Sequence, residues 1–239
     1  MSNPLLAARG LVKAHGPTPA LRGASIEVAA GEVVAVTGPS GSGKSTLLHC
    51  LAGILRPDIG TVEYDGQRLD LLPEKRLSEL RRTEFGVVFQ FGQLIPELTA
   101  ADNVALPLLL AGTPRPAARE RAGEWLERFG VRDREGRRPG EMSGGEAQRV
   151  ALARAMATGP RVVFADEPTG ALDSLAGEQV MTALVRTARE SGTAVLLVTH
   201  DDQVAAYADR EVALRDGAVP GDGSPSTVSA ALLAGEAAR

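Results

Sequence analysis

One segment, Val33–Thr46, constrains the fold of this 239-residue chain more than any other. It opens with Val33–Thr37, an apolar and β-branched run that is typical of a strand buried on both faces. The residues that follow fit the pattern G-x-x-x-x-G-K-[ST], and they are Gly38, Pro39, Ser40, Gly41, Ser42, Gly43, Lys44, Ser45 and Thr46. Glycines allow successive backbone N–H groups to point inward, and a helix over Lys44–Ala52 would aim its positive end at the same anion. The segment therefore predicts a strand, a phosphate-binding loop and a helix.

Two side chains of this loop supply the chemistry that a bound polyphosphate needs. Lys44 would reach the β- and γ-phosphates as a point charge, and the Ser45 hydroxyl would be a ligand of Mg²⁺. The chain has three lysines beside 23 arginines, so a lysine at this position is a specific choice. The alternative is a Gly-rich turn without a ligand, and the strand before the loop and the helix after it argue against that alternative.

A second apolar run ends in two carboxylates. Val162–Ala165 is expected to be a buried strand, and Asp166 and Glu167 follow it directly. Two adjacent carboxylates at a strand end are unfavourable unless cations or protons compensate them. Mg²⁺ would compensate Asp166, and Glu167 would then orient or deprotonate an attacking water. Considered alone, the run could equally be a strand followed by an acidic helix cap.

The segment Met142–Gln148 contains a helix start that could be a capped helix end, an anion-binding site or both. Ser143 is expected to cap this helix, and Glu146 three residues later completes a capping box. Because Gly144 and Gly145 lie between them, the same helix start could also bind an anion. One nucleotide does not need two such sites in one chain, whereas two copies arranged head to tail would each complete the other's site.

Strands and helices alternate along most of the chain, which predicts an α/β fold with a mainly parallel sheet. Further strands are expected at Leu5–Val12, Ala24–Val28, Thr61–Tyr64, Gly86–Phe89 and Ala194–Thr199. Further helices are expected at Arg76–Arg82, Asp102–Leu110, Arg115–Phe129, Glu146–Ala157, Ser174–Ser191 and 227–234. The arginine-rich middle, about 91–145, is expected to be a helical subdomain, and about 1–90 and 146–239 a catalytic core, within a single domain over 1–239.

Composition and charge exclude several classes of protein. The net charge is −4, which argues against a general nucleic-acid-binding protein. Cys50 is the only cysteine, so an internal disulfide framework is excluded and a reducing compartment is expected. The longest apolar stretch, near Ala105–Gly112, is interrupted by Pro107 and is too short to cross a bilayer. We therefore expect a cytoplasmic chain that reaches a membrane only through a partner.

Taken together, these motifs resemble those of the ATP-binding subunits of ABC transporters, over essentially the whole chain. The phosphate loop looks like that family's Walker A motif, Val162–Glu167 like its Walker B motif, and Ser143–Gln148 like its signature motif. Gln90 matches the glutamine of the family's Q-loop, Asp173 ends an Ala-Leu-Asp match to the D-loop, and His200 matches the switch histidine. These elements occur in the order that the family requires.

The resemblance implies a P-loop NTPase fold with a RecA-like core, an antiparallel β region and a helical subdomain. It also implies an ATPase that uses ATP and Mg²⁺, forms an ATP-dependent homodimer and energises a permease at the cytoplasmic side of the cell membrane. The catalytic residues would be Lys44, Gln90, Glu167 and His200. The metal ligands would be Ser45, Gln90 and Asp166. Beyond the phosphate loop, the residues that contact nucleotide would be His15, Ser143, Gly144, Gly145 and Asp173.

Two stretches narrow the resemblance to one group of the family. The amino-acid sequences of Phe89–Thr99 and Glu167–Ser174 are similar to those of the macrolide- and lipoprotein-export ATPases. In that group two ATPase subunits serve permeases with few membrane helices, so export or extraction of the substrate is implied. Several apolar residues after Gln90 are expected to line a groove for a permease helix; they are Phe91, Leu94, Ile95 and Leu98.

The chain departs from the family's pattern at the place where an aromatic residue, usually tyrosine, stacks on adenine. His15 occupies that place. Imidazole can stack over a smaller area than a phenol ring, so its contribution to base binding should be weaker and dependent on pH. The alternative is that His15 is an exposed loop residue without this role. Met142 and Glu146 are smaller departures, since the signature motif more usually has leucine and glutamine there.

Two other functional classes stay open. One is a non-transport ABC protein that acts in DNA repair or translation, although such proteins usually carry two ATPase units or a long coiled-coil insertion. The other is a scaffold that binds nucleotide without hydrolysing it, and the presence of Glu167 and His200 argues against this class.

Overall fold

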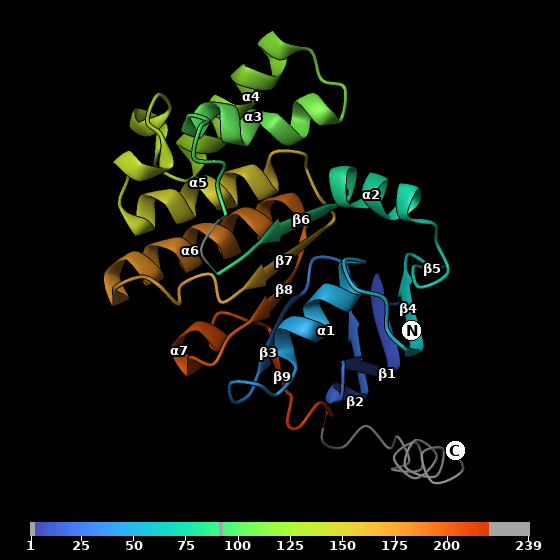
Figure 1. The fold of residues 1–239 in the computed structure, drawn as a ribbon. Coiled ribbons are helices and arrows are strands. Elements are labelled where there is room, and N and C mark those ends of the chain that lie inside the picture. Colours follow the sequence, from blue (N-terminus) through green and yellow to red (C-terminus); the bar gives the residue numbers. More distant parts are fainter. Residues whose placement is uncertain (1–2, 91–92, 220–239) are drawn as a thin grey trace, which may run out of the picture.

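The computed structural model describes residues 3–90 and 93–219 and contains two β-sheets with helices around them (Figure 1). The parallel sheet has five strands in the order β6 (Phe85–Val88), β7 (Val162–Asp166), β8 (Ala194–Val198), β3 (Val33–Thr37) and β9 (Arg210–Ala213). The antiparallel sheet has four strands in the order β2 (Thr18–Val28), β1 (Leu6–His15), β4 (Ile59–Tyr64) and β5 (Gln67–Arg68).

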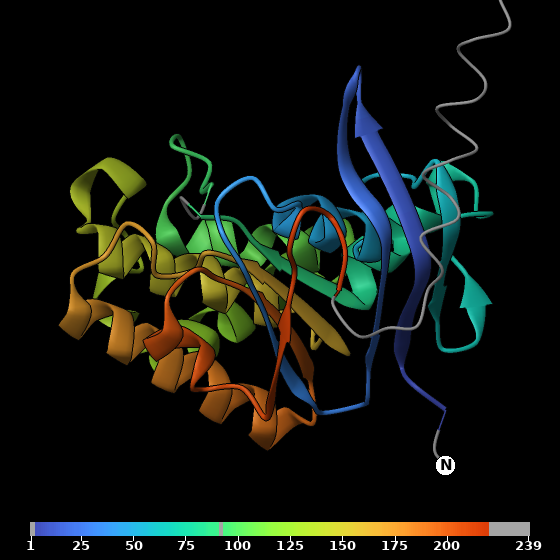
Figure 2. The same cartoon turned by 90° about the horizontal axis from the view of Figure 1, so that it is seen from below.

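The helices cover the parallel sheet on both faces. On one face lie α5 (Gly144–Met156) and α6 (Ser174–Ser191), and α3 (Ala100–Leu110) and α4 (Arg115–Arg128) pack on α5. On the other face α1 (Lys44–Leu51) lies between the two sheets, with α2 (Glu74–Thr83) beside it (Figures 1 and 2). The short helix α7 (Asp202–Ala205) follows β8, and 3₁₀ turns lie at Arg132–Arg134 and Pro139–Glu141.

The apolar runs of the central strands are explained by these two layers. In β7, Val163 and Ala165 belong to the core under α3–α6, whereas Val162 and Phe164 belong to the core between the sheets. All four side chains are fully buried. A strand with a core on each face has no solvent side, so it needs apolar residues at consecutive positions instead of alternating ones.

The predicted α/β fold with a mainly parallel sheet is confirmed. The strand Val33–Thr37 and the helix Ser174–Ser191 have the predicted bounds, and the other predicted elements shift by a few residues at their ends. The first two strands are longer than expected because β1 and β2 continue to a hairpin turn between His15 and Thr18. The strands β5 and β9 and the helix α7 were not predicted. The helix expected at 227–234 and the residue Phe91 lie outside the described residues.

The helices of the middle region do not enclose a separate core. Trp125, Leu126 and Phe129 of the α4 region are buried, and they belong to the same cluster as the α5 residues and one face of the parallel sheet. Most arginines between 119 and 138 are exposed. Among the described residues, no helix combines the length and apolar character that crossing a membrane requires.

Candidate functional site

Four neighbouring parallel strands end at the same edge of the sheet, and the predicted site residues follow them there. The phosphate loop follows β3, Asp166 ends β7, Thr199 and His200 follow β8, and Gln90 follows β6 two residues after its end. Ligands of α/β proteins bind outside the carboxyl ends of the strands. The topology therefore gathers residues from distant parts of the sequence into one candidate site (Figure 1).

The phosphate loop is held by close backbone contacts that only glycine permits. Gly43 has φ +99°, and a Cβ atom there would lie 2.2 Å from the carbonyl oxygen of Ala20 in β2. A Cβ atom on Gly38, where φ is +142°, would lie 2.1 Å from the carbonyl oxygen of Leu214. The loop is thus wedged between the start of β2 and the segment after β9, which fixes its backbone before any ligand binds.

Lys44 lies inside this loop. Its side chain is buried, with 7% of the residue exposed, and its ammonium group donates hydrogen bonds to the carbonyl oxygens of Gly38 at 2.8 Å and Pro39 at 3.0 Å. A buried cation whose hydrogen bonds go to carbonyl oxygens gains from an anion placed nearby. Lys44 is therefore positioned to exchange these contacts for phosphate oxygens.

Ser45 and Asp166 form a pair of hard oxygen donors. The Ser45 hydroxyl donates to Oδ1 of Asp166 at 3.1 Å. The pKa of Asp166 is raised above its ordinary value mainly because burial disfavours the charged carboxylate. No cluster of three or more His, Cys, Asp or Glu side chains able to hold a metal occurs in the described part of the chain. A hydroxyl and one carboxylate are the donors that Mg²⁺ takes when substrate phosphates and waters complete its shell, so the pair fits that ion.

The fold brings Gln90 next to the segment that follows β7. A Cβ atom on Gly170 would lie 3.3 Å from its amide nitrogen, which places the Gln90 side chain beside the segment that follows Glu167. Gln90 itself is exposed. The absence of a side chain at Gly170 therefore leaves the space that Gln90 occupies.

Glu167 is held by its backbone and by two neighbours. Its φ is +46°, a left-handed conformation that a residue with a side chain seldom adopts. Oε1 of Glu167 lies 2.7 Å from Nδ1 of His200, and Oε2 accepts a hydrogen bond from the Thr199 hydroxyl at 3.3 Å. These contacts orient the carboxylate next to the exposed ring of His200. Thr199 was not among the predicted site residues, although it directly precedes His200 at the end of an apolar run.

The start of α5 has the predicted capping box. The Glu146 amide donates to the Ser143 hydroxyl at 3.3 Å, and the Ser143 amide donates to Oε2 of Glu146 at 2.8 Å. Arg134 adds a 2.8 Å ion pair to Oε1 of Glu146. The Ser143 amide, followed by the Arg134 guanidinium, lowers the pKa of Glu146 to about 2. Ser143 and Gly144 are nevertheless exposed, so their outer face can contact another molecule.

This helix start lies beside the start of α6. Gly145 approaches Ala176 so closely that a Cβ atom there would lie 3.1 Å from the Ala176 side chain. Asp173 caps α6 by accepting a 2.8 Å hydrogen bond from the Ala176 amide. The two helix starts line a shared hollow of about 300 Å³ together with Leu175, which is 66% exposed. The structure thus brings Ser143, Gly144, Gly145 and Asp173 together.

His15 lies against the first turn of α1. Its Nε2 atom is 3.3 Å from the Thr46 hydroxyl, and the residue is exposed at the end of β1. The ring is therefore next to the last residue of the phosphate loop, at the place where a base attached to bound phosphates could lie.

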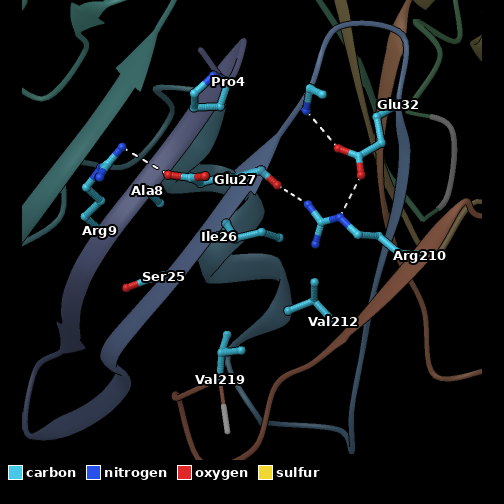
Figure 3. A pocket seen from close by; sticks show the side chains of 11 residues that line it. Pro4, Ala8, Arg9, Ser25, Ile26, Glu27, Glu32, Arg210, Val212 and Val219 are labelled. Carbon is cyan, nitrogen blue, oxygen red and sulfur yellow. Dashed lines mark hydrogen bonds and ion pairs between the residues drawn. The ribbon is translucent and has the colours of Figure 1, made fainter. Parts of the chain in front are cut away.

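A larger hollow of about 650 Å³ lies elsewhere, on the antiparallel sheet and β9 (Figure 3). Its charged side chains are paired with one another: Arg9 contacts Glu27 at 3.0 Å, and Arg210 contacts Glu32 at 2.6 Å and the Glu27 carbonyl (Figure 3). The rest of its lining is largely apolar, and none of the predicted site residues belongs to it. The gathered motifs, and not this larger hollow, define the candidate site.

Comparison with known protein families gives one match. The family model described as ABC transporter matches residues 21–170, which extend from β2 to the loop after β7. The matched part contains the phosphate loop, Gln90, the start of α5 and both carboxylates that follow β7.

Several proteins of lipoprotein-releasing systems are similar to the chain over nearly their whole length. The ATP-binding protein LolD 2 of Caulobacter vibrioides is 47% identical over 221 residues, which cover 91% of this chain and 97% of that protein. LolD of Bordetella pertussis is 48% identical over 225 residues, which cover 92% and 97% respectively.

Solved structures agree with the fold. The dimeric structure of MJ0796, a bacterial ABC transporter cassette, has a TM-score of 0.83 and 38% identity, covering 90% of this chain and 96% of that one. The same cassette is also known as a dimer in a post-hydrolysis state bound to ADP and phosphate, with the same similarity. CbiO1 of Clostridium perfringens, part of the transporter complex cbiONQ, has a TM-score of 0.83 and 30% identity, covering 96% and 92%.

Proposed function

The chain belongs to the ABC transporter family as an ATP-binding subunit, and we propose that its ATP hydrolysis drives the release of lipidated proteins from a membrane through a permease partner. The observation that carries the proposal is the 47–50% identity to ATP-binding proteins of lipoprotein-releasing systems. The similarity extends over 82–92% of the chain, so it includes regions outside the motifs shared by all ABC ATPases.

The phosphate loop and the β7 end would bind MgATP. Lys44 would leave the carbonyls of Gly38 and Pro39 for the β- and γ-phosphate oxygens. The ion would be held by Ser45, Asp166 and Gln90, and when bound it would neutralise charge on the phosphates. The Asp166 carboxylate lies in a buried place that raises its pKa, so a nearby divalent cation would favour its charged form.

Glu167 would act on the attacking water. The carboxylate is fixed by the contacts with His200 and Thr199, so it would accept a proton from water, or align it, without first losing side-chain freedom. His200 is exposed beside it and would contact the γ-phosphate, where negative charge has to be stabilised. His15 would support the adenine ring next to Thr46.

The exposed start of α5 would serve a second copy of the chain. Ser143, Gly144 and Gly145 would contact the γ-phosphate of ATP held by the partner's phosphate loop, and Asp173 would lie at the same interface. Binding of ATP would then join two copies, and hydrolysis would release them. The dimers of the similar cassette MJ0796 support this arrangement.

The permease would dock near Gln90. Leu94, Ile95 and Leu98 are half-buried, and Leu94 packs against the core under α3–α6. The Asn103 side chain fixes the backbone of Ile95 from both sides, donating to its carbonyl oxygen at 3.1 Å and accepting from its amide at 2.8 Å. The half-buried apolar edge would receive a permease helix and place the subunit at the cytoplasmic side of the membrane. The residues 91–145 would then act as the helical subdomain of a single domain over 1–239, whose catalytic core is 1–90 and 146–239.

Reconstitution tests the proposed function. The chain is co-expressed with a candidate permease from a neighbouring gene, one with four membrane helices and a large extracytoplasmic domain, and the complex is placed in liposomes that contain a lipoprotein. We expect ATP-dependent release of the lipoprotein, and no release with the Glu167→Gln variant. ATP hydrolysis that the permease and the lipoprotein leave unchanged, without release, would contradict the proposal and favour a non-transport ABC protein.

A further inference from the structure

The carboxylate of Asp58 holds the end of β1 at a point where the antiparallel sheet stops. The last β1–β4 pair is Val12 with Ile59, and the Asp58 amide donates to the Val12 carbonyl oxygen at 2.8 Å. Beyond this point β4 offers no strand partner for the amide of Ala14, because β4 begins at Ile59. The side chain of Asp58 replaces the missing partner: its Oδ2 accepts the Ala14 amide at 2.8 Å.

The second oxygen of the Asp58 carboxylate binds the side chain of Lys13, the residue before Ala14. Oδ1 of Asp58 accepts a 2.7 Å hydrogen bond from the ammonium group of Lys13, whose side chain is only 18% exposed. These two contacts, first from Lys13 and then from the Ala14 amide, lower the pKa of Asp58. The carboxylate is therefore charged, and both contacts are present, throughout the neutral pH range.

The pairing of β1 with β2 is irregular near the hairpin tip. The pairing of β1 with β2 shifts register between Lys13 and Ala14, and Ala14 lies opposite Pro19, which has no amide hydrogen to donate. The two residues after Ala14 are His15, the last residue of β1, and Gly16 in the turn. Where the ladder is irregular, the Asp58 carboxylate adds two contacts between the end of β1 and the segment after α1.

We propose that Asp58 is a positioning residue that fixes His15 beside Thr46 and thereby sets the affinity of the subunit for the base of its nucleotide. The inference rests on the proposed role of His15. Asp58 lies 43 residues after His15 in the sequence and 12 residues after Thr46, and it contacts the chain directly before His15. It acts on the base without touching the phosphate loop, so its effect is confined to ligands that carry a base.

Ligands with and without a base separate this role from a general effect on folding. ATP and inorganic tripolyphosphate, each with Mg²⁺, are titrated into the full chain and into Asp58→Ala, Asp58→Asn and His15→Ala variants, and KM and kcat for ATP are measured. We expect Asp58→Ala to raise Kd and KM for ATP by about two- to tenfold, the range of one lost ring contact. The Kd for tripolyphosphate and kcat at saturating ATP should stay unchanged.

Two further variants make the test specific. Asp58→Asn keeps one oxygen for the Ala14 amide but loses the charge that Lys13 pairs with, so its Kd for ATP should lie between those of Asp58→Ala and the native chain. Glu27→Gln is the matched control, because it removes an exposed ion pair with Arg9 at the other end of the same two strands and should leave both affinities unchanged.

A double variant shows whether Asp58 acts through His15. In the His15→Ala background, Asp58→Ala should cause no further loss of ATP affinity. The inference is overturned if Asp58→Ala binds ATP as the native chain does while His15→Ala binds it more weakly, or if Asp58→Ala weakens tripolyphosphate equally. Native ATP affinity in His15→Ala would refute the role of His15 and with it this inference, while the proposed hydrolysis and transport would stand.

Discussion

The end of the parallel sheet and the start of α5 both carry motif residues, but they are completed in different ways. At the sheet end, groups from separate strands satisfy one another: Lys44 is bonded to its own loop, Ser45 to Asp166, and Glu167 to His200. At the start of α5, the hydrogen bonds between Ser143 and Glu146 cap the helix, and Ser143 and Gly144 remain exposed.

The difference suits the two regions to the two roles proposed for them, ATP hydrolysis at the sheet end and contact with a second copy at the start of α5. At the sheet end, contacts within the chain orient Lys44, Asp166 and Glu167, the residues proposed to act on ATP. At the start of α5, the capping box and the Arg134–Glu146 pair fix the helix start, and its outer face is exposed. A rigid and exposed helix start is suited to contact the nucleotide of a second copy. Substitutions at the sheet end should therefore mainly lower the hydrolysis rate, whereas substitutions at the start of α5 should also lower the free energy of unfolding.

The largest effect is expected at Glu167. Glu167→Gln keeps the size of the side chain but cannot take a proton from water, so the rate of phosphate release should fall by about 10²- to 10⁴-fold. Binding of MgATP should persist, because the phosphate loop is unchanged. Phosphate release is followed at saturating MgATP, and Glu190→Gln at the exposed end of α6 serves as a control. A rate within twofold of the native rate would remove Glu167 from the mechanism.

A somewhat smaller loss is expected at Lys44. Lys44→Ala removes a preorganised cation from the phosphates, so kcat should fall by about 10²- to 10³-fold and ATP affinity should weaken as well. The exposed lysine of α2 provides the control, since Lys75→Ala should leave both quantities unchanged. Circular dichroism checks that the fold persists. Native hydrolysis in Lys44→Ala would mean that the loop does not bind the phosphates as proposed.

The start of α5 should respond in stability as well as in activity. Ser143→Ala removes the helix cap, which should lower the free energy of unfolding by about 1 kcal/mol in the absence of nucleotide. Urea unfolding of the monomer measures this loss, and the same variant should show reduced hydrolysis because the composite site loses a hydroxyl. A Ser143→Ala variant with the native free energy of unfolding would show that the capping bond contributes nothing. Lys44→Ala, which removes no helix cap, is the comparison for this measurement.

The smallest effect concerns pH. The pKa of Glu146 is about 2 in the folded chain, below its ordinary value, so its contacts stabilise the fold above the ordinary value and this contribution declines as the pH falls toward 2. Glu146→Gln should therefore cost about 0.5 kcal/mol near pH 7 and less near pH 3.5. Urea unfolding at both pH values measures the difference between variant and native chain. A difference that does not change with pH would contradict the assigned contacts.

Local patterns in the sequence were sufficient for much of the fold and for most of the site. Val33–Thr37 and Ser174–Ser191 were predicted with their observed bounds because burial on two faces and helical periodicity are visible within one segment. The capping box at Ser143 and Glu146 was likewise predicted from spacing alone. Such features depend on residues that are near one another in the sequence.

Features that depend on distant contacts were not predicted. The strand β9 is short and partly exposed at the sheet edge, so Arg210–Ala213 has no apolar run that would identify it. The left-handed backbone of Glu167 and its bond to Thr199 arise only when β7 and β8 lie side by side. The contact of Asp58 with Ala14 joins residues that are 44 apart, and no motif marks either of them.

The association of the Glu167→Gln variant shows whether the sheet end of one copy and the start of α5 of another form one ATP site. Size-exclusion chromatography with light scattering is run with and without MgATP, and bound nucleotide is measured in each peak. We expect twice the mass of one chain with MgATP and a single-chain mass without it. Adding Ser143→Arg should abolish the dimer while ATP stays bound, because a bulky cation would clash at the composite site. A Glu167→Gln chain that remains monomeric with ATP bound would show that the start of α5 does not complete the ATP site of a second copy.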